Sequence, residues 1–202
     1  MAETLKTANE IEDIFRLVVL KILSLDPDAA ENRSRVRFPW GSDLAGGTSS
    51  APGWPKDRDV CMVYALPQDN FYNRQRDVHC EDHGGRDLVS VDEHTDVHFI
   101  NFANYGPAAY ECARDIRDGL FSDEIRDFLA QNNFALAADV PAIRRVPELF
   151  NGEWRNRVDI SAVFNEYVRR ERVVKTIEKV HLNLKAVDSA GLALDKTSVI
   201  EK

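Results

Sequence analysis

The 202-residue sequence has few cysteines, no long apolar segment and no excess of basic residues. Its cysteines, Cys61, Cys80 and Cys112, are odd in number and no secretory signal precedes them. We therefore expect a reducing compartment during assembly and no disulfide framework. The longest apolar run near the N-terminus, Leu17–Leu20, is too short to span a bilayer, so no membrane insertion is expected.

The charge of the chain is acidic overall. It has 26 Lys and Arg against 34 Asp and Glu, which gives a formal net charge of −8 at pH 7. Attraction to DNA phosphates needs clustered positive charge, so this balance opposes a DNA-binding role, although a local patch at Arg169, Arg170 and Arg172 stays open. An acidic protein can also surround DNA without retaining it, because like charges keep the passing polyanion mobile.

The N-terminal segment has the pattern of an amphipathic helix. Thr7 and Glu10 have the spacing of a capping box, and apolar residues recur at helical intervals from Ile11 to Leu25. Pro27 ends the pattern. One face of this helix is expected to be buried.

The middle of the chain alternates short strands, long connections and two helices. Strands are predicted at 35–40, 59–66 and 94–102, and polar or Gly/Pro-rich connections at 41–57 and 67–91. Helices are predicted from Pro107 to Leu120 and from Ser122 to about Asn132.

The C-terminal part is typical of a sheet. Residues 134–140, 157–168 and 174–186 are predicted strands, and the polar link at 169–172 suggests an antiparallel hairpin between the last two. Residues 187–202 lose all periodicity and are expected to form a tail or arm. The predicted fold class is α+β, one domain over residues 1–186, with two or three helices on one face of a largely antiparallel sheet.

Two segments resemble catalytic or ligand sites without completing them. Gly41–Thr48 approaches a phosphate-binding loop, but Gly47 replaces the lysine and no helix can follow. The alternative from a different functional class is a metal-dependent enzyme, whose metal ligands would come from a cluster of histidines with one cysteine. Those residues are His79, Cys80, His83, His94 and His98. They lack the paired spacing of a zinc site, so a polar loop beside a strand is favoured.

Large aromatic side chains flank the Gly/Pro-rich connection. Trp40 and Trp54 either hold their own loop or anchor a partner subunit. We count them, with Arg169 and Arg170, as candidate subunit-interface residues. No catalytic, cofactor-binding or metal-binding residue is assigned.

Three segments carry a resemblance to a known family. They are NFANYGPAAY at 101–110, ARDIRDGLF at 113–121 and IRRVPELFNGEWRNRVDISAVFN at 143–165. Their order and content resemble phage neck-terminator proteins. The long segments 41–57 and 67–91 depart from that pattern, and the resemblance does not explain them.

The resemblance implies a fold like that of tail-terminator proteins and a structural subunit of the head–tail junction. Such a subunit would form a ring, of six copies, that closes the tail tube, meets the head connector and lets DNA pass. It would belong to the virion and assemble in the bacterial cytoplasm without a cofactor. A head-completion adaptor and a tail-tube subunit are the alternatives within this class.

Overall fold

The computed structural model describes residues 5–39, 55–82, 88–137, 139–150, 152–175, 179–187 and 193–201. The helices are α1 (Ala8–Ile22), α2 (Ala30–Arg35), the 3-10 helix η2 (Tyr72–Arg74), α3 (Ala109–Gly119) and α4 (Asp123–Gln131). The strands are β1 (Val36–Arg37), β2 (Val60–Pro67), β3 (Asp77–Asp82), β4 (Leu88–Tyr105), β5 (Phe134–Leu136), β6 (Arg144–Arg145), β7 (Glu148–Phe150), β8 (Glu153–Arg155), β9 (Arg157–Val174), β10 (Lys179–Val187) and β11 (Ala193–Glu201).

Helix α1 begins at the predicted capping box. The backbone N–H of Glu10 donates to the Thr7 hydroxyl at 3.3 Å, and the Glu10 carboxylate accepts from the backbone N–H of Thr7 at 2.7 Å. These two bonds satisfy donors that a helix start otherwise leaves open. The face that carries Ile11, Phe15 and Val18 is buried, as the periodicity predicted.

Strands β4 and β9 form the centre of the main sheet. Each has 18 residues, and they pair antiparallel over their full length, from Tyr105 opposite Arg157 to Leu88 opposite Val174. On its other edge β4 pairs with β2 near one end and with β3 near the other. The short strands β5 and β6 pair with β9, and β1 lies parallel to β2 at the sheet edge.

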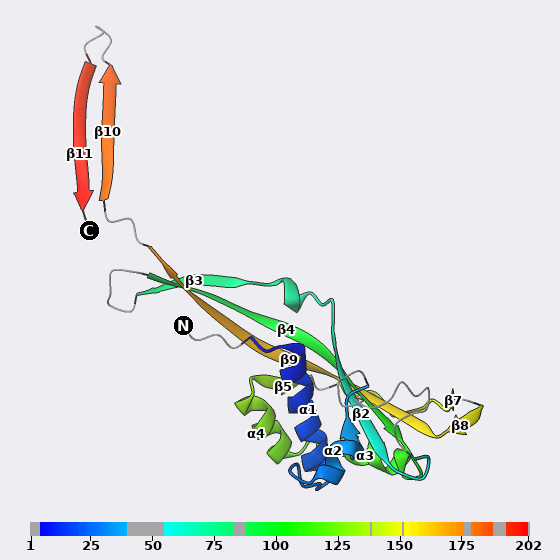
Figure 1. The fold of residues 1–202 in the computed structure, drawn as a ribbon. Helices are drawn as coiled ribbons and strands as arrows, with labels where there is room; N and C mark the ends of the chain where they lie inside the picture. Colours follow the sequence, from blue (N-terminus) through cyan, green and yellow to red (C-terminus); the bar gives the residue numbers. More distant parts are fainter. Residues whose placement is uncertain are drawn as a thin grey trace.

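The α-helices cover one face of this sheet at the end where β2 lies (Figure 1). Ile100 and Phe102 of β4, and Ile160 of β9, are at most 2% exposed beneath them. The ring of Phe164 is fully buried, with its centroid 4.5 Å from that of Phe15 on α1. The predicted α+β class is confirmed. Val158, Ile160, Ala162 and Phe164 lie on the buried face of β9.

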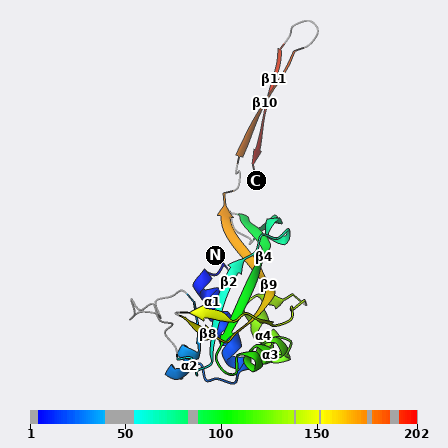
Figure 2. The ribbon, with the colours of Figure 1, turned by 90° about the vertical axis from the view of Figure 1, so that its right-hand side faces the viewer.

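The predicted loop at 67–91 is wrong over much of its length. It contains η2, β3 and the start of β4, and β3 pairs antiparallel with residues 88–93 of β4. This part of the sheet continues past the helices (Figure 2). Water reaches much of β3, and even Val78 and Cys80 on one of its faces are exposed. The strand therefore lacks the strong apolar face that identifies a half-buried strand.

The predicted hairpin between 157–168 and 174–186 is also wrong. Strand β9 continues through 169–172 to Val174 and pairs with β4, whereas β10 pairs with β11. Strand β11 occupies a segment predicted to be a non-periodic tail, and Figure 1 shows the β10–β11 hairpin apart from the main sheet. A charged segment resembles a turn by composition, but a strand beyond the helical layer accepts charged side chains on either face.

Candidate subunit interfaces

Arg169 is the centre of an ion-pair cluster on β9. Its guanidinium donates to three carboxylates, those of Glu171 at 3.2 Å, Glu93 at 2.7 Å and Glu81 at 3.1 Å. The Tyr167 hydroxyl also donates to Glu93. This bond, with the one from Arg169, holds the pKa of Glu93 below its ordinary value. The cluster therefore joins β3, β4 and β9 in the part of the sheet that extends past the described α-helices.

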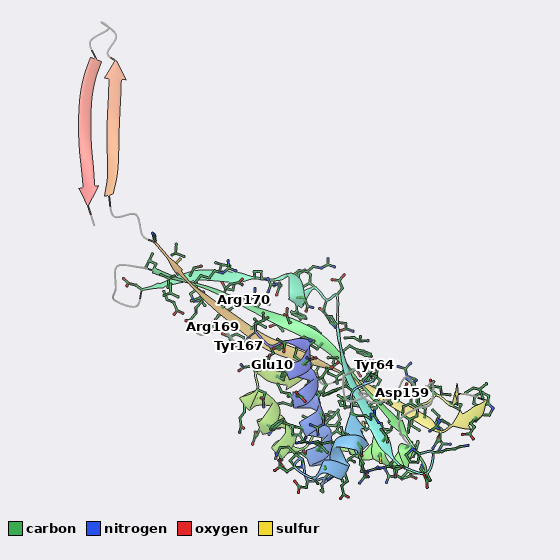
Figure 3. All side chains as sticks on the ribbon, viewed as in Figure 1. Glu10, Tyr64, Asp159, Tyr167, Arg169 and Arg170 are labelled. Atoms are coloured by element: carbon green, nitrogen blue, oxygen red, sulfur yellow. The ribbon has the colours of Figure 1, made fainter. Side chains whose placement is uncertain are left out.

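The predicted interface role of Arg169 and Arg170 stays a prediction. The two residues are consecutive in a strand, so their side chains point to opposite faces of the sheet (Figure 3). The guanidinium of Arg169 is bound within its own chain, and Arg170 lies opposite Asp92 in the register. Trp40 and Trp54, like the loop at 41–48, lie outside the described residues.

The candidate metal ligands are dispersed among strands. His79 and Cys80 are consecutive in β3 and face opposite ways, and the ring of His79 contacts Glu81 at 3.1 Å. His83 lies outside the described residues. Among the residues that the structure describes, no group of three or more His, Cys, Asp or Glu could hold a metal ion.

His98 belongs to a buried polar cluster. Its Nε2 is hydrogen-bonded to Glu166 Oε2 at 2.9 Å, and the other carboxylate oxygen of Glu166 accepts from Lys6 Nζ at 3.2 Å. The ammonium of Lys6 lies 5.2 Å from the centroid of the Phe134 ring, which His98 also contacts. The cluster ties Lys6, which precedes the Thr7 cap of α1, to β4, β5 and β9, so its role is structural.

Strands β7 and β8 form a separate hairpin at one end of the molecule (Figure 1). In its register Leu149 lies directly opposite Trp154, and their exposed fractions are 56% and 62%. Directly opposed residues share one face of a hairpin, so these two side chains form one apolar surface. Val146, which precedes β7, is also exposed. We call Leu149 and Trp154 the hairpin pair.

The base of this hairpin is fixed to the main sheet. The carboxylate of Glu148 accepts from the Tyr105 hydroxyl at 2.7 Å and from Arg157 Nη1 at 3.2 Å. Arg157 also donates two hydrogen bonds to Asp159. Burial, together with the bond to Glu148, raises the pKa of Tyr105, so its phenol stays protonated and donates at neutral pH. The neighbouring Leu149 faces the other way, toward solvent.

The sequence predictions did not include the hairpin pair. The available signal was the dipeptide Asn151-Gly152, which is the favoured sequence of a two-residue hairpin turn. Gly152 has φ 80°, the left-handed conformation that such a turn requires.

The described chain is a sheet scaffold whose ionic clusters join its own strands and whose apolar hairpin pair faces outward. None of its described helices is long and apolar enough to cross a membrane. A rigid scaffold with an apolar surface at one end is characteristic of a structural subunit that contacts other proteins.

The chain belongs to the phage neck terminator protein family, whose model matches residues 47–188, more than two thirds of the sequence. It is a structural component of the phage neck, and thus of the virion, and contacts other head or tail proteins. The matched region includes all three segments on which the resemblance was based. No curated protein matches the chain.

Proposed function

We propose that copies of this chain form a ring of six that terminates the tail tube and joins it to the head connector. The match to the neck terminator family over residues 47–188 carries this proposal. The family description places a terminator at the neck, and closure of a tube requires a subunit that repeats around the tube axis.

The shape of the subunit supports a ring. Identical copies that close by rotation contact one another through two different surfaces, one on each side of the subunit. Here the hairpin of β7 and β8 lies at one end of the β4–β9 ladder, and β3 lies beside its other end (Figure 1). Two separate ends of one rigid sheet are suited to such a head-to-tail contact.

The charge of the chain supports passage of DNA. A ring of subunits that each carry a net charge of −8 repels a polyanion in its channel and does not retain it. Cys61, Cys80 and Cys112 are free thiols, which agrees with assembly in the reducing cytoplasm of the host. We assign no catalytic activity to the protein.

The proposal is tested with purified protein, alone and mixed with purified tail tubes. Mass photometry should detect a closed oligomer, either free or on the tubes, and negative-stain electron microscopy should show one ring at a tube end. Particles that stack along the tube would favour a tail-tube subunit. Binding to isolated connectors but not to tubes would favour a head-completion adaptor. A monomer that binds neither would overturn the proposal.

A further inference from the structure

We propose that the arm, which is the hairpin of β10 and β11, packs its apolar face on the hairpin pair of the next copy in the ring. The inference rests on the proposed ring and names the two surfaces that close it. In the described chain, the arm and the β7–β8 hairpin are the two sheets that stand outside the main sheet.

The register of the arm gives it one apolar and one polar face. Directly opposed residues share a face, and residues along each strand alternate between faces. The polar face contains two directly opposed pairs of unlike charge, Lys179 with Glu201 and Lys185 with Asp195. Six of the eight residues on the other face are aliphatic, namely Val180, Leu182, Leu184, Ala186, Leu194 and Ile200.

The arm needs a second layer against its apolar face. A two-stranded hairpin on its own is marginally stable in water, and it becomes stable when its apolar face packs on another element. β10 and β11 pair with each other as a separate sheet. In Figures 1 and 2 the arm extends away from the body, beyond the end of β9, so the described elements of its own chain do not supply that layer.

The hairpin pair is the surface of the described chain that best fits this role. Leu149 and Trp154 are 56% and 62% exposed and lie directly opposite each other. Among the large apolar residues that are exposed in the described ranges, no other two are opposed in a strand register. Val173 and Val174, for example, are consecutive in β9 and therefore lie on opposite faces. Two hairpins that each have one apolar face can pack together as two sheets do.

The hairpin pair also has the properties of a binding anchor. Exposed tryptophans contribute strongly to the binding free energy of many interfaces. The bonds of Glu148 to Tyr105 and Arg157 fix the hairpin before any partner arrives, so little conformational entropy is lost on binding. Glu153 is the exposed neighbour of Trp154, but it lies on the other face of the hairpin and stays in water when the pair is covered.

A second copy of the chain is the partner that brings these two surfaces together. The arm and the β7–β8 hairpin lie at opposite ends of the molecule in Figure 1, and Figure 2 likewise shows the arm extending away from β8. One copy therefore cannot cover its own hairpin pair with its own arm. Copies arranged head to tail can, because each contributes one arm and one hairpin pair, and a closed ring leaves neither uncovered.

The first test changes each surface in the full chain, under the conditions in which the unaltered protein forms its oligomer. Trp154→Ala removes the anchor, and Leu182→Asp places a charge on the apolar face of the arm. Each change should weaken the contact between neighbours by about thirtyfold or more and leave monomers. Thermal unfolding shows whether the body of each variant remains folded.

Each change has a matched control. Phe71→Ala removes another aromatic side chain, which is 69% exposed beside η2. Asn183→Asp adds the same charge as Leu182→Asp at the next residue, on the polar face of the arm. Both control variants should assemble as the unaltered protein does, and an equal loss for Asn183→Asp and Leu182→Asp would contradict the face assignment.

The outcomes separate this inference from the ring on which it rests. If Trp154→Ala or Leu182→Asp assembles as the unaltered protein does, the inference is overturned and the ring proposal still stands. An unaltered protein that never oligomerises, with or without tubes, would instead overturn the ring itself.

A crosslinking experiment identifies the partner without a destabilised variant. A chain that carries a photoreactive phenylalanine analogue at position 154 is mixed with an excess of isotope-labelled unaltered chain, with and without tail tubes. Crosslinks should join position 154 to labelled peptides from residues 179–187 or 193–201. Crosslinks to the unlabelled arm alone would show a contact within one chain, and crosslinks only to tail-tube or connector protein would show a different partner. Either result would overturn the inference.

Discussion

Nε2 of His98 lies 2.9 Å from Oε2 of Glu166, in a site where Glu166 is 1% exposed. The same carboxylate accepts a hydrogen bond from Lys6. One buried acid thus joins two neighbouring strands to the residue that precedes the Thr7 cap of α1. An ionised carboxylate is tolerated in such a place because cationic and hydrogen-bonding partners replace the lost water.

Removing that carboxylate should strongly destabilise the fold. Glu166→Ala leaves His98 and Lys6 without their shared partner, and breaking a buried pair in this way costs about 3–5 kcal/mol. Urea unfolding at neutral pH measures the loss. The matched control, Glu153→Ala, removes an exposed carboxylate from β8 and should change stability by less than about 0.5 kcal/mol. Equal effects of the two changes would contradict a structural role for the cluster.

The packing of Phe164 gives a second prediction. Its ring is fully buried against Phe15, so Phe164→Ala should lower the free energy of unfolding by about 3–5 kcal/mol. The adjacent Val163, on the opposite face of β9, is only partly buried, and Val163→Ala should cost less. A loss below about 1 kcal/mol for Phe164→Ala would mean that this face does not form the core.

The sequence predicted the parts of the fold in which burial is one-sided. In α1 and in the 158–164 stretch of β9, apolar residues recur with the period of a helix or a strand, because one face packs into the core and the other is less buried. β3 and the distal half of β9 extend past the helices, so their alternation carries no such signal. Without a periodic signal only the composition was left to interpret, and the charged residues Arg169–Arg172 therefore resembled a turn.

The candidate interface was less predictable for a different reason. Periodicity indicates which residues share a face, but not whether another part of the chain covers that face. Leu149 and Trp154 are apolar residues within strands, and only the fold shows that no described element covers them. The dipeptide Asn151-Gly152 in the sequence could have identified the hairpin, though not its exposure.

Gly106 is expected to resist substitution. It has φ 115°, and a Cβ at this position would lie 2.7 Å from both Asp59 Cα and Arg58 O. Gly106→Ala should therefore cost more than the roughly 1–3 kcal/mol of backbone strain alone. Gly152 also has a positive φ, of 80°, but an added Cβ meets nothing within 4 Å. Gly152→Ala should lower the free energy of unfolding by only about 1–2 kcal/mol. Equal losses of stability at the two sites would show that the close contacts of an added Cβ at Gly106 are not costly.

Two glutamates of α1 should respond to pH in opposite directions. Burial raises the pKa of Glu12 above 4.5, although its carboxylate accepts from the Ala65 N–H. The ionised form therefore opposes folding above the raised pKa, and this effect disappears below pH 4.5. Glu12→Gln, which keeps an acceptor oxygen, should be more stable than the unaltered protein at pH 7, with a difference that shrinks as the pH falls toward 4.5.

Glu10 provides the opposite case. Its bonds from the Thr7 backbone and side chain lower its pKa, so ionised Glu10 supports folding above 4.5, the ordinary value. Glu10→Gln should reduce stability at pH 7, and the loss should fade as the pH falls through the lowered pKa of Glu10. Urea unfolding of both variants between pH 3 and 8 measures the stability difference from the unaltered protein at each pH. Differences of the same sign for Glu12→Gln and Glu10→Gln at pH 7 would show that the burial of Glu12 is misassigned.

The carboxylates around Arg169 lead to the last prediction. Glu81, Glu93 and Glu171 converge on one guanidinium, so Arg169→Ala removes their shared counter-charge and leaves like charges close together. The unfolding temperature should fall, and added NaCl should restore part of it, because salt screens repulsion between partly exposed charges. Arg126→Ala is the control: its pair with Asp123, one turn along an exposed helix, should contribute little at any salt concentration. A loss for Arg169→Ala that does not change with salt would indicate that its packing on the strands, and not its charge, stabilises this end of the sheet.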